Sequence, residues 1–414
     1  MTGKRHLTLV PQYMHQFSCI GSACSDSCCI GWRVSIDKET YKKYRRVKHP
    51  DLKPLFQEKV TRNRSNPSKS DYAKIKMNKD RRCPFLNKDK LCRIQLALGE
   101  EYLSATCKFY PRTINKINGV LEISATVSCP EAARLILFNP EVMEFDQQTG
   151  LLQSGVFVHR EVDTKKPVIP HRLHRYFWEL RIFTIQVIQN RQFKLWERLI
   201  FLGLFYKKVE EYLEQDRSKE ILELIARYTN MINEGIIRDS IAGIPVQTTI
   251  QMKLLKELAD ERFFQGINSP RYFQCFKEFL RGVNYQKGLQ EEEIGEQYSQ
   301  AYAEYYQPYM QDREYILENY LVNYIFKNIF PLGNKNGPVF DEYLMFVIHY
   351  ALIKMHLIGM AAFHQGLGDE LVLKLIQSFA KTVEHNAIYL FKVKELLRAN
   401  NLATMAYAAI MIKN

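Results

Sequence analysis

Eight of the nine cysteines in this 414-residue chain lie within its first 130 residues. They are Cys19, Cys24, Cys28, Cys29, Cys83, Cys92, Cys107 and Cys129, and the rest of the chain contains only Cys275. The N-terminal residues lack the apolar run of a signal peptide, so we predict a cytoplasmic protein. In a reducing compartment, clustered cysteines are metal ligands more often than disulfides. We therefore expect a subset of the eight to bind a metal.

The spacing of these cysteines restricts the kind of metal site. It reads C-x4-C-x3-C-C and then C-x8-C-x14-C-x21-C. A zinc finger would need two C-x2-C pairs, and the sequence has none. The C-x3-C-x2-C pattern of radical S-adenosylmethionine enzymes is also absent, because Cys29 directly follows Cys28. Four thiolates suffice for one [4Fe-4S] cluster or one tetrahedral zinc ion, so the spacing is compatible with either metal site. It is also compatible with a small domain in which zinc stabilises the fold and takes part in no reaction.

The segments that carry the cysteines predict loops with short helices and strands. Proline follows cysteine at Cys129-Pro130, which suits a ligand loop where the chain turns. Helices are predicted over Lys38–Arg46 and residues 131–138, and Asn118-Gly119 predicts a turn before a short strand. Residues 1–150 are therefore predicted to form a small, irregular, cysteine-rich metal-binding domain with short strands.

The rest of the chain has the apolar periodicity of helices from about residue 172 onward. The longest apolar stretch, residues 344–363, is interrupted by His349 and Lys354, which favours a buried helix over a membrane span. We predict that residues 151–414 form an all-α domain, which makes the fold class mainly α. The amphipathic runs lie at about 218–236, 248–263, 270–282, 296–330, 340–363, 369–380 and 384–412.

The residues between the cysteines resemble the CxxCxxCC-type zinc/iron-chelating proteins. The matching segments are 17–21 (FSCIG), 28–32 (CCIGW), 83–86 (CPFL), 91–94 (LCRI) and 110–112 (YPR). Residues 128–134 (SCPEAAR) narrow the resemblance to the flagellin lysine-N-methylase branch, and residues 318–324 (ENYLVNY) extend it into the helical half. The first cysteines are spaced x4 and x3 rather than x2 and x2, which leaves the choice of ligands open.

This resemblance implies an S-adenosylmethionine-dependent protein-lysine N-methyltransferase that acts on flagellin in the bacterial cytoplasm. It also implies an iron–sulfur cluster held by the motif cysteines. No strand leads into a G-x-G-x-x-G turn, so the cofactor would bind outside the common doubly wound fold. A cluster with one iron free of cysteine would bind the amino and carboxylate groups of the cofactor, and this hypothesis predicts three cysteine ligands.

Methylation of lysine requires an unprotonated amine, although the amine has a pKa near 10.4. The enzyme must desolvate or deprotonate the amine and align it with the methyl sulfonium. Aromatic faces accept a cation, so the aromatic residues among the cysteine loops are candidates for binding the lysine side chain. The alternative for each is that it only packs over the metal site. They are Trp32, Tyr41, Tyr102 and Tyr110.

We predict Tyr110 and Glu131 as catalytic residues, and Trp32, Asp37, Arg112 and Arg134 as cofactor-binding residues. The arginines would neutralise the cofactor carboxylate, and the acidic side chains would orient the amine or the ribose. Structural alternatives exist for both acids. Glu131 is favoured at a helix start by the helix dipole, and Asp37 stands where a helix N-cap is expected.

The charge distribution supports an alternative function. Residues 1–150 hold 26 Lys and Arg against 15 Asp and Glu, a net +11, whereas residues 151–414 carry only +2. Such a basic half suits a non-catalytic zinc- or iron-binding module that recruits an acidic protein or nucleic acid. Alternatively, the cations offset bound thiolates. The chain lacks an ordered basic-aromatic repeat, so a nucleic-acid partner is not expected.

Overall fold

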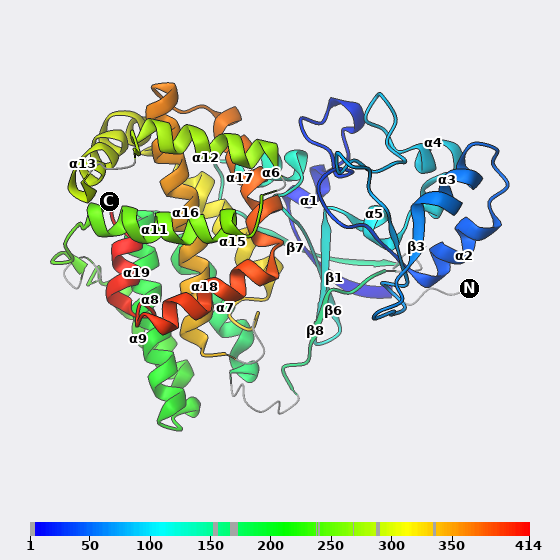
Figure 1. The fold of residues 1–414 in the computed structure, drawn as a ribbon. Coiled ribbons are helices and arrows are strands. Elements are labelled where there is room, and N and C mark those ends of the chain that lie inside the picture. The colour runs from blue at the N-terminus through cyan, green and yellow to red at the C-terminus, as the bar shows by residue number, and fades with distance from the viewer. Residues whose placement is uncertain are drawn as a thin grey trace. The chain divides into compact units, whose positions relative to one another are not determined.

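The computed structural model shows a mainly α protein, as predicted (Figure 1). It divides into two compact units. Unit 1 comprises Met1–Ala132 and Asp146–Glu161, and unit 2 comprises Ala133–Phe145 and Val162–Asn414. The chain therefore passes from one unit to the other three times, first within helix α6 (Pro130–Leu137). The described residues are 5–151, 156–165, 173–236, 238, 241–267, 269–286, 290–333 and 337–414.

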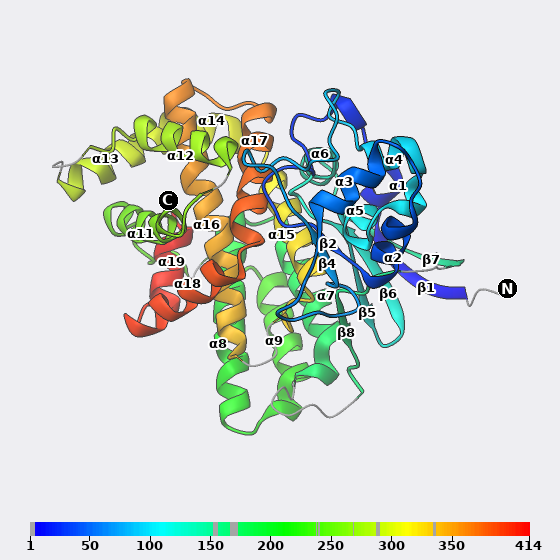
Figure 2. The ribbon, with the colours of Figure 1, turned by 45° about the vertical axis from the view of Figure 1, so that its right-hand side comes forward.

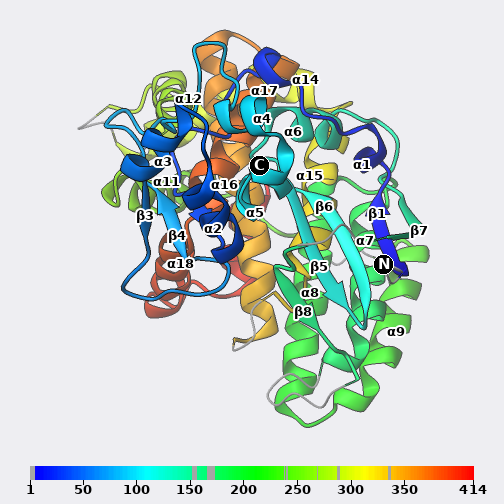
Figure 3. The same cartoon turned by 90° about the vertical axis from the view of Figure 1, so that its right-hand side faces the viewer.

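A five-stranded sheet in the order β7-β1-β6-β5-β8 forms one part of unit 1. β1 runs parallel to β6, and β5 and β6 form an antiparallel hairpin that contains the turn predicted at Asn118-Gly119 and the short strand predicted after it. Both turn residues have positive φ, at 50° and 87°, which asparagine and glycine tolerate. Figure 3 shows β1, β6 and β5 side by side. The strands are β1 (Arg5–Pro11), β5 (Arg112–Ile117), β6 (Val120–Ala125), β7 (Phe145–Leu151) and β8 (Arg160–Val162).

A second, three-stranded antiparallel sheet lies in the order β2-β4-β3 and supports the cysteine loops. With α2 (Lys38–Arg46) and α3 (Leu52–Lys59) it belongs to a small apolar core, in which the rings of Tyr44 and Phe56 stack 4.1 Å apart. The predicted helix over Lys38–Arg46 is confirmed. The remaining elements are β2 (Ser35–Ile36), β3 (Val60–Arg62), β4 (Ala73–Ile75), α1 (Tyr13–Gln16), η1 (Gly21–Ala23), α4 (Arg93–Leu98), η2 (Glu100–Tyr102) and α5 (Ala105–Phe109).

Helix α16 (Val339–His364) forms the core of unit 2 and is buried along nearly its whole length. It is the one described helix long and apolar enough to cross a membrane, and the window that qualifies is fully buried. The prediction of a buried helix over residues 344–363 is thus confirmed. Figure 2 shows α16 among its neighbours α8 (Leu195–Glu214), α12 (Pro270–Gly282), α17 (Asp369–Phe379) and α19 (Met405–Ile412).

Two glycines allow α12 and α16 to approach closely. A Cβ atom on Gly282 would overlap the carbonyl oxygen of Gly359, and a Cβ atom on Gly359 would meet the side chain and backbone of Phe279. Only a hydrogen atom fits at either position without moving a backbone. A larger residue at either site would therefore separate the two helices that make up much of this core.

The predicted helical runs over 296–330 and 384–412 are each divided in the structure. The first is broken by a π-helical turn, η5 (Tyr302–Tyr306), shortly before Pro308, whose nitrogen has no hydrogen to donate. The second run is divided between α18 (Ala387–Ala399) and α19 by a turn in which Asn401 has a φ of 55°. The remaining elements are η3 (His174–Tyr176), α7 (Phe177–Ile188), η4 (Ser218–Glu220), α9 (Ile221–Asn233), α11 (Thr248–Phe264), α13 (Glu291–Ala301), α14 (Gln307–Met310), α15 (Tyr315–Asn328), η6 (Ala380–Glu384) and α18 (Ala387–Ala399).

Candidate functional site

Backbone contacts in unit 1 bring cysteines together that lie far apart in the sequence. The amide of Cys83 donates a hydrogen bond to the carbonyl of Cys29 at 2.8 Å. Next to this bond, Ile30 and Arg82 form an isolated antiparallel bridge. The turn that carries Cys28 and Cys29 is thereby fixed beside the loop that carries Cys83.

Two further cysteines join this region through the short helices. Cys92 pairs with Leu86 in a second isolated bridge and is the N-terminal flanking residue of α4. Cys107 lies in α5, where Ser104 caps the helix by accepting the amide of Cys107 at 3.4 Å. Both cysteines pack against the small apolar core that contains Cys83.

The electrostatics show that five cysteines share one neighbourhood, which we call the first thiol group: Cys28, Cys29, Cys83, Cys92 and Cys107. Burial, together with the charges of Cys92 and Cys28, raises the pKa of Cys107 to about 12, although the hydrogen bond with Ser104 opposes this shift. A hydrogen bond with Cys28 lowers the pKa of Cys29, but a bond with Cys83 and burial raise it overall. Such thiols stay protonated at neutral pH unless a cation compensates the thiolates.

The other three cysteines, Cys19, Cys24 and Cys129, form a second thiol group, which is linked to the first because the charge of Cys28 also raises the pKa of Cys24. Burial raises the pKa of Cys129 to about 12, and the charges of Cys24 and Cys19 also raise it. Hydrogen bonds from the amides of Ala132 and Glu131 partly offset this effect. These amides belong to the first turn of α6, so the helix start presents donors to the sulfur, as at many thiolate sites.

The two thiol groups suit a metal in their donor chemistry. Sulfur is the preferred ligand of iron–sulfur clusters and of structural zinc, and all nine cysteines are free thiols. In the described part of the chain, however, no three Cys, His, Asp or Glu side chains converge as a ready metal site. Binding of a metal would therefore require these side chains to change their positions.

Two predicted site residues, Trp32 and Tyr110, lie together among the cysteines. The indole nitrogen of Trp32 donates to the carbonyl of Cys28 at 2.5 Å, and the rings of Trp32 and Tyr110 are 5.5 Å apart and tilted by 40°. The Tyr110 hydroxyl is 3.2 Å from that of Ser128. Burial raises the pKa of Tyr110 well above its usual value, and the charges of Cys129 and Cys28 add to this. The aromatic pair is therefore close to both thiol groups.

Asp37 has contacts that account for it structurally. One carboxylate oxygen accepts the Thr40 amide at 2.8 Å, and the other accepts the Thr40 hydroxyl at 2.8 Å and the Ala105 amide at 3.1 Å. Burial raises the pKa of Asp37, but these hydrogen bonds outweigh it and hold the pKa below the usual value. Asp37 thus caps α2 and ties it to the start of α5, the helix of Cys107.

The other predicted residues are more dispersed. The Arg112 guanidinium lies 5.1 Å from the ring centre of Phe17, at the start of β5. Glu131 is in the first turn of α6, two residues after Cys129, whereas Arg134 is exposed near the end of α6 and belongs to unit 2. Of the two further aromatic candidates, Tyr41 packs edge-on against Tyr72 at 5.3 Å, and Tyr102 lies 5.8 Å from the Lys43 ammonium.

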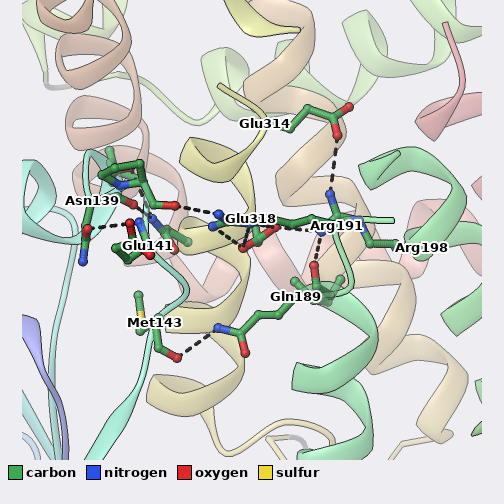
Figure 4. A network of polar contacts seen from close by, with 12 residues as sticks. Asn139, Glu141, Met143, Gln189, Arg191, Arg198, Glu314 and Glu318 are labelled. Atoms are coloured by element: carbon green, nitrogen blue, oxygen red, sulfur yellow. Dashed lines mark hydrogen bonds and ion pairs between the residues drawn. The ribbon is translucent and has the colours of Figure 1, made fainter. Parts of the chain in front are cut away.

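Unit 2 contains a buried polar network that sequence periodicity did not predict (Figure 4). The fully buried carboxylate of Glu318 accepts hydrogen bonds from Arg191 at 2.9 and 3.0 Å and from Arg198 at 2.7 Å. Arg191 also donates to the carbonyl of Pro140 at 2.6 Å. Gln189 donates to the carbonyl of Met143 at 2.9 Å. The signal available in the sequence was one arginine, Arg198, and one glutamate, Glu318, inside otherwise apolar helical runs, whereas Arg191 lies in the turn between α7 and α8.

Known proteins similar to this chain identify its family. The model of the FliB lysine N-methylase C-terminal domain matches residues 181–411, which is more than half of the chain. Proteins named lysine-N-methylase from Salmonella typhimurium and Salmonella choleraesuis are each 25% identical over 389 residues, covering 91% of this chain and 92% of the relative. The flagellar biosynthetic protein FliU of Salmonella muenchen is 36% identical over 147 residues, covering 35% of this chain and 86% of that protein.

No solved structure matches the chain. The family match covers most of unit 2, and the full-length relatives extend the similarity through the cysteine-bearing unit. The chain belongs to the FliB lysine N-methylase family and is a protein-lysine N-methyltransferase.

Proposed function

We propose that this methyltransferase transfers methyl groups from S-adenosylmethionine to lysine side chains of flagellin in the cytoplasm. The family match and the name of the FliU relative support a flagellar protein as the substrate. Among flagellar proteins, we propose flagellin as the substrate. The lysine amine attacks the methyl carbon of the sulfonium, the carbon–sulfur bond breaks, and S-adenosylhomocysteine leaves as a neutral thioether.

The observation that carries the proposed site is the Trp32–Tyr110 pair beside both thiol groups. Aromatic faces hold a cation while water is excluded, and they tolerate the growing methylammonium. Because its pKa is raised, the Tyr110 hydroxyl stays protonated at neutral pH and acts as a hydrogen-bond donor rather than as a base. Glu131, two residues from Cys129, is the carboxylate that we propose to accept the lysine proton.

We also propose that cysteines of the first thiol group hold a [4Fe-4S] cluster, with zinc as the alternative metal. A bound cluster would supply positive charge that stabilises the buried thiolates, together with a Lewis-acidic iron. Asp37 positions α5 and hence Cys107 for this role. The metal is identified by measuring iron, zinc and acid-labile sulfide in protein purified without oxygen. Iron and sulfide in equal amounts support the cluster, and zinc without sulfide contradicts it.

The methylation itself is tested by mass spectrometry of flagellin. Purified flagellin is incubated anaerobically with the full chain and S-adenosylmethionine, and methyl increments on lysines are counted. We expect increments with the unaltered protein and a large loss with Trp32→Ala, whereas Trp178→Ala in unit 2 serves as a matched tryptophan control. Flagellin that gains no methyl groups from protein with its full metal content would contradict the proposed substrate or donor.

A further inference from the structure

Unit 2 contains a cavity that none of the residues proposed above lines. Its volume is about 380 Å³, within the range of small-molecule sites. It lies between the turn that leads into α8 and the start of α15. The floor is formed by buried Arg198 and Glu318, which are 2% and 0% exposed, and by half-buried Glu314. The exposed rim is formed by Arg191, Gln192, Lys194, Arg238, Gln311 and Asp312.

Both charge signs line this cavity. On the floor, Glu318 is neutralised by two arginines, and Arg198 is also 3.4 Å from Glu314. The buried Nε of Arg198 has no hydrogen-bond partner. On the rim, the Lys194 ammonium and the Asp312 carboxylate form no ion pair with any other described residue. The cavity thus offers a cation and an anion on its rim that are not neutralised by each other or by their neighbours.

A ligand of a single charge fits such a lining poorly. Three carboxylates would repel a phosphate, and four basic side chains would repel a simple cation. A zwitterion can pair with side chains of both signs. These contacts replace the contacts with water that its two charges lose on entry. The side chains of Phe193 and Tyr315 add an aromatic wall.

We infer that this cavity binds an α-amino-acid group. Its carboxylate is bound by Lys194, and its ammonium is bound by Asp312 and Glu314. Two sources carry this group, namely the amino-acid end of S-adenosylmethionine and a free amino acid such as methionine. For the first source the inference rests on the proposed function, whereas for the second it does not.

Calorimetry on the full chain tests the inference with three probes. S-adenosylmethionine and methionine both carry the α-amino-acid group, and 5′-methylthioadenosine lacks it. We expect Lys194→Ala and Asp312→Ala each to weaken binding of at least one of the first two about tenfold, because each removes one charged contact. Binding of 5′-methylthioadenosine should stay unchanged. The exposed residues Lys219 and Glu292 provide matched alanine controls that leave every affinity unaltered.

The probes also distinguish the two sources. If the Lys194 and Asp312 variants weaken binding of S-adenosylmethionine much more than that of methionine, the cavity is assigned to the methyl donor, and the reverse assigns it to a free amino acid. If neither zwitterion binds, or if the Lys194 and Asp312 variants bind both as the controls do, the inference is overturned. Methylation of flagellin is scored separately. If the Lys194 and Asp312 variants still methylate flagellin, the proposed function stands. If a zwitterion binds in a way that depends on these residues but flagellin is not methylated, the inference stands.

Discussion

Lys354 is a buried cation in the centre of α16, and its replacement by methionine should stabilise unit 2 in a pH-dependent way. Its ammonium donates to the carbonyl of Ile412 at 3.2 Å and lies 5.2 and 5.8 Å from the ring centres of Tyr302 and Tyr350. Burial lowers the pKa of Lys354 from 10.5 to about 7, and the charge of Glu314 opposes this only in part.

The sign of the effect follows from the protons bound in each state. Below about pH 7 the lysine is charged in the folded and the unfolded chain, so the full cost of burying the charge applies. Between about pH 7 and pH 10.5 the folded lysine is neutral while the unfolded one still binds a proton, so stability rises with pH. The slope approaches about 1.4 kcal/mol per pH unit, and the whole change is at most about 5 kcal/mol.

Lys354→Met removes this dependence. The variant should be more stable than the parent at pH 6, and its advantage should shrink steadily above about pH 7. Loss of the hydrogen bond to Ile412 costs about 1 kcal/mol at every pH and leaves the slope unaltered. Because tyrosines and cysteines also titrate at high pH, the informative quantity is the difference between the two proteins.

Urea unfolding at a series of pH values measures that difference. The fluorescence of Trp178 and Trp196 reports on unit 2 in a Trp32→Phe background. Lys219→Met, at an exposed site, is the control and should show a difference that does not change with pH. A Lys354→Met difference that is equally constant from pH 6 to about pH 9.5 would refute the desolvation of this lysine.

Three further predictions concern the contacts of the two units. Asp37→Ala should lower the stability of unit 1 by about 1–2 kcal/mol, since it removes a helix cap, and should speed hydrogen exchange in α5, as measured by mass spectrometry. Glu318→Gln should destabilise unit 2 by about 3–5 kcal/mol in urea unfolding, because the buried Arg198 and the exposed Arg191 both lose their carboxylate partner. Cys107→Ser should reduce the iron and sulfide content, whereas Cys275→Ser in unit 2 should not; equal metal content in both variants would remove Cys107 from the ligands.

Local signals in the sequence were sufficient for several elements. Asp37 predicts the start of α2 because a carboxylate there satisfies an otherwise unpaired amide. Asn118-Gly119 predicts the turn before β6 because both residues adopt positive φ. The apolar stretch of α16 predicts a core helix because His349 and Lys354 interrupt it, and ionisable side chains are rare within membrane spans.

Contacts between distant segments were not predictable from the sequence. The division of the cysteines into two thiol groups depends on pairings such as that of Cys29 with Cys83, for which periodicity carries no signal. Helical periodicity also treats Arg198 and Glu318 as exceptions on an apolar face. Each charged side chain is buried because it forms an ion pair with the other. The sequence pattern suggested one change of character near residue 150, whereas contacts divide the chain at three points.

These three passages between the units affect the order in which a nascent chain completes its structure. The five-stranded sheet cannot close until residues 146–161 have left the ribosome, although most of unit 1 emerges earlier. Residues 133–145 emerge before that point, yet their partners Gln189 and Arg191 are synthesised only later. Folding of the two units is therefore interleaved during synthesis, and a gene fragment that encodes only residues 181–411 would produce helices without the segment that their polar network binds.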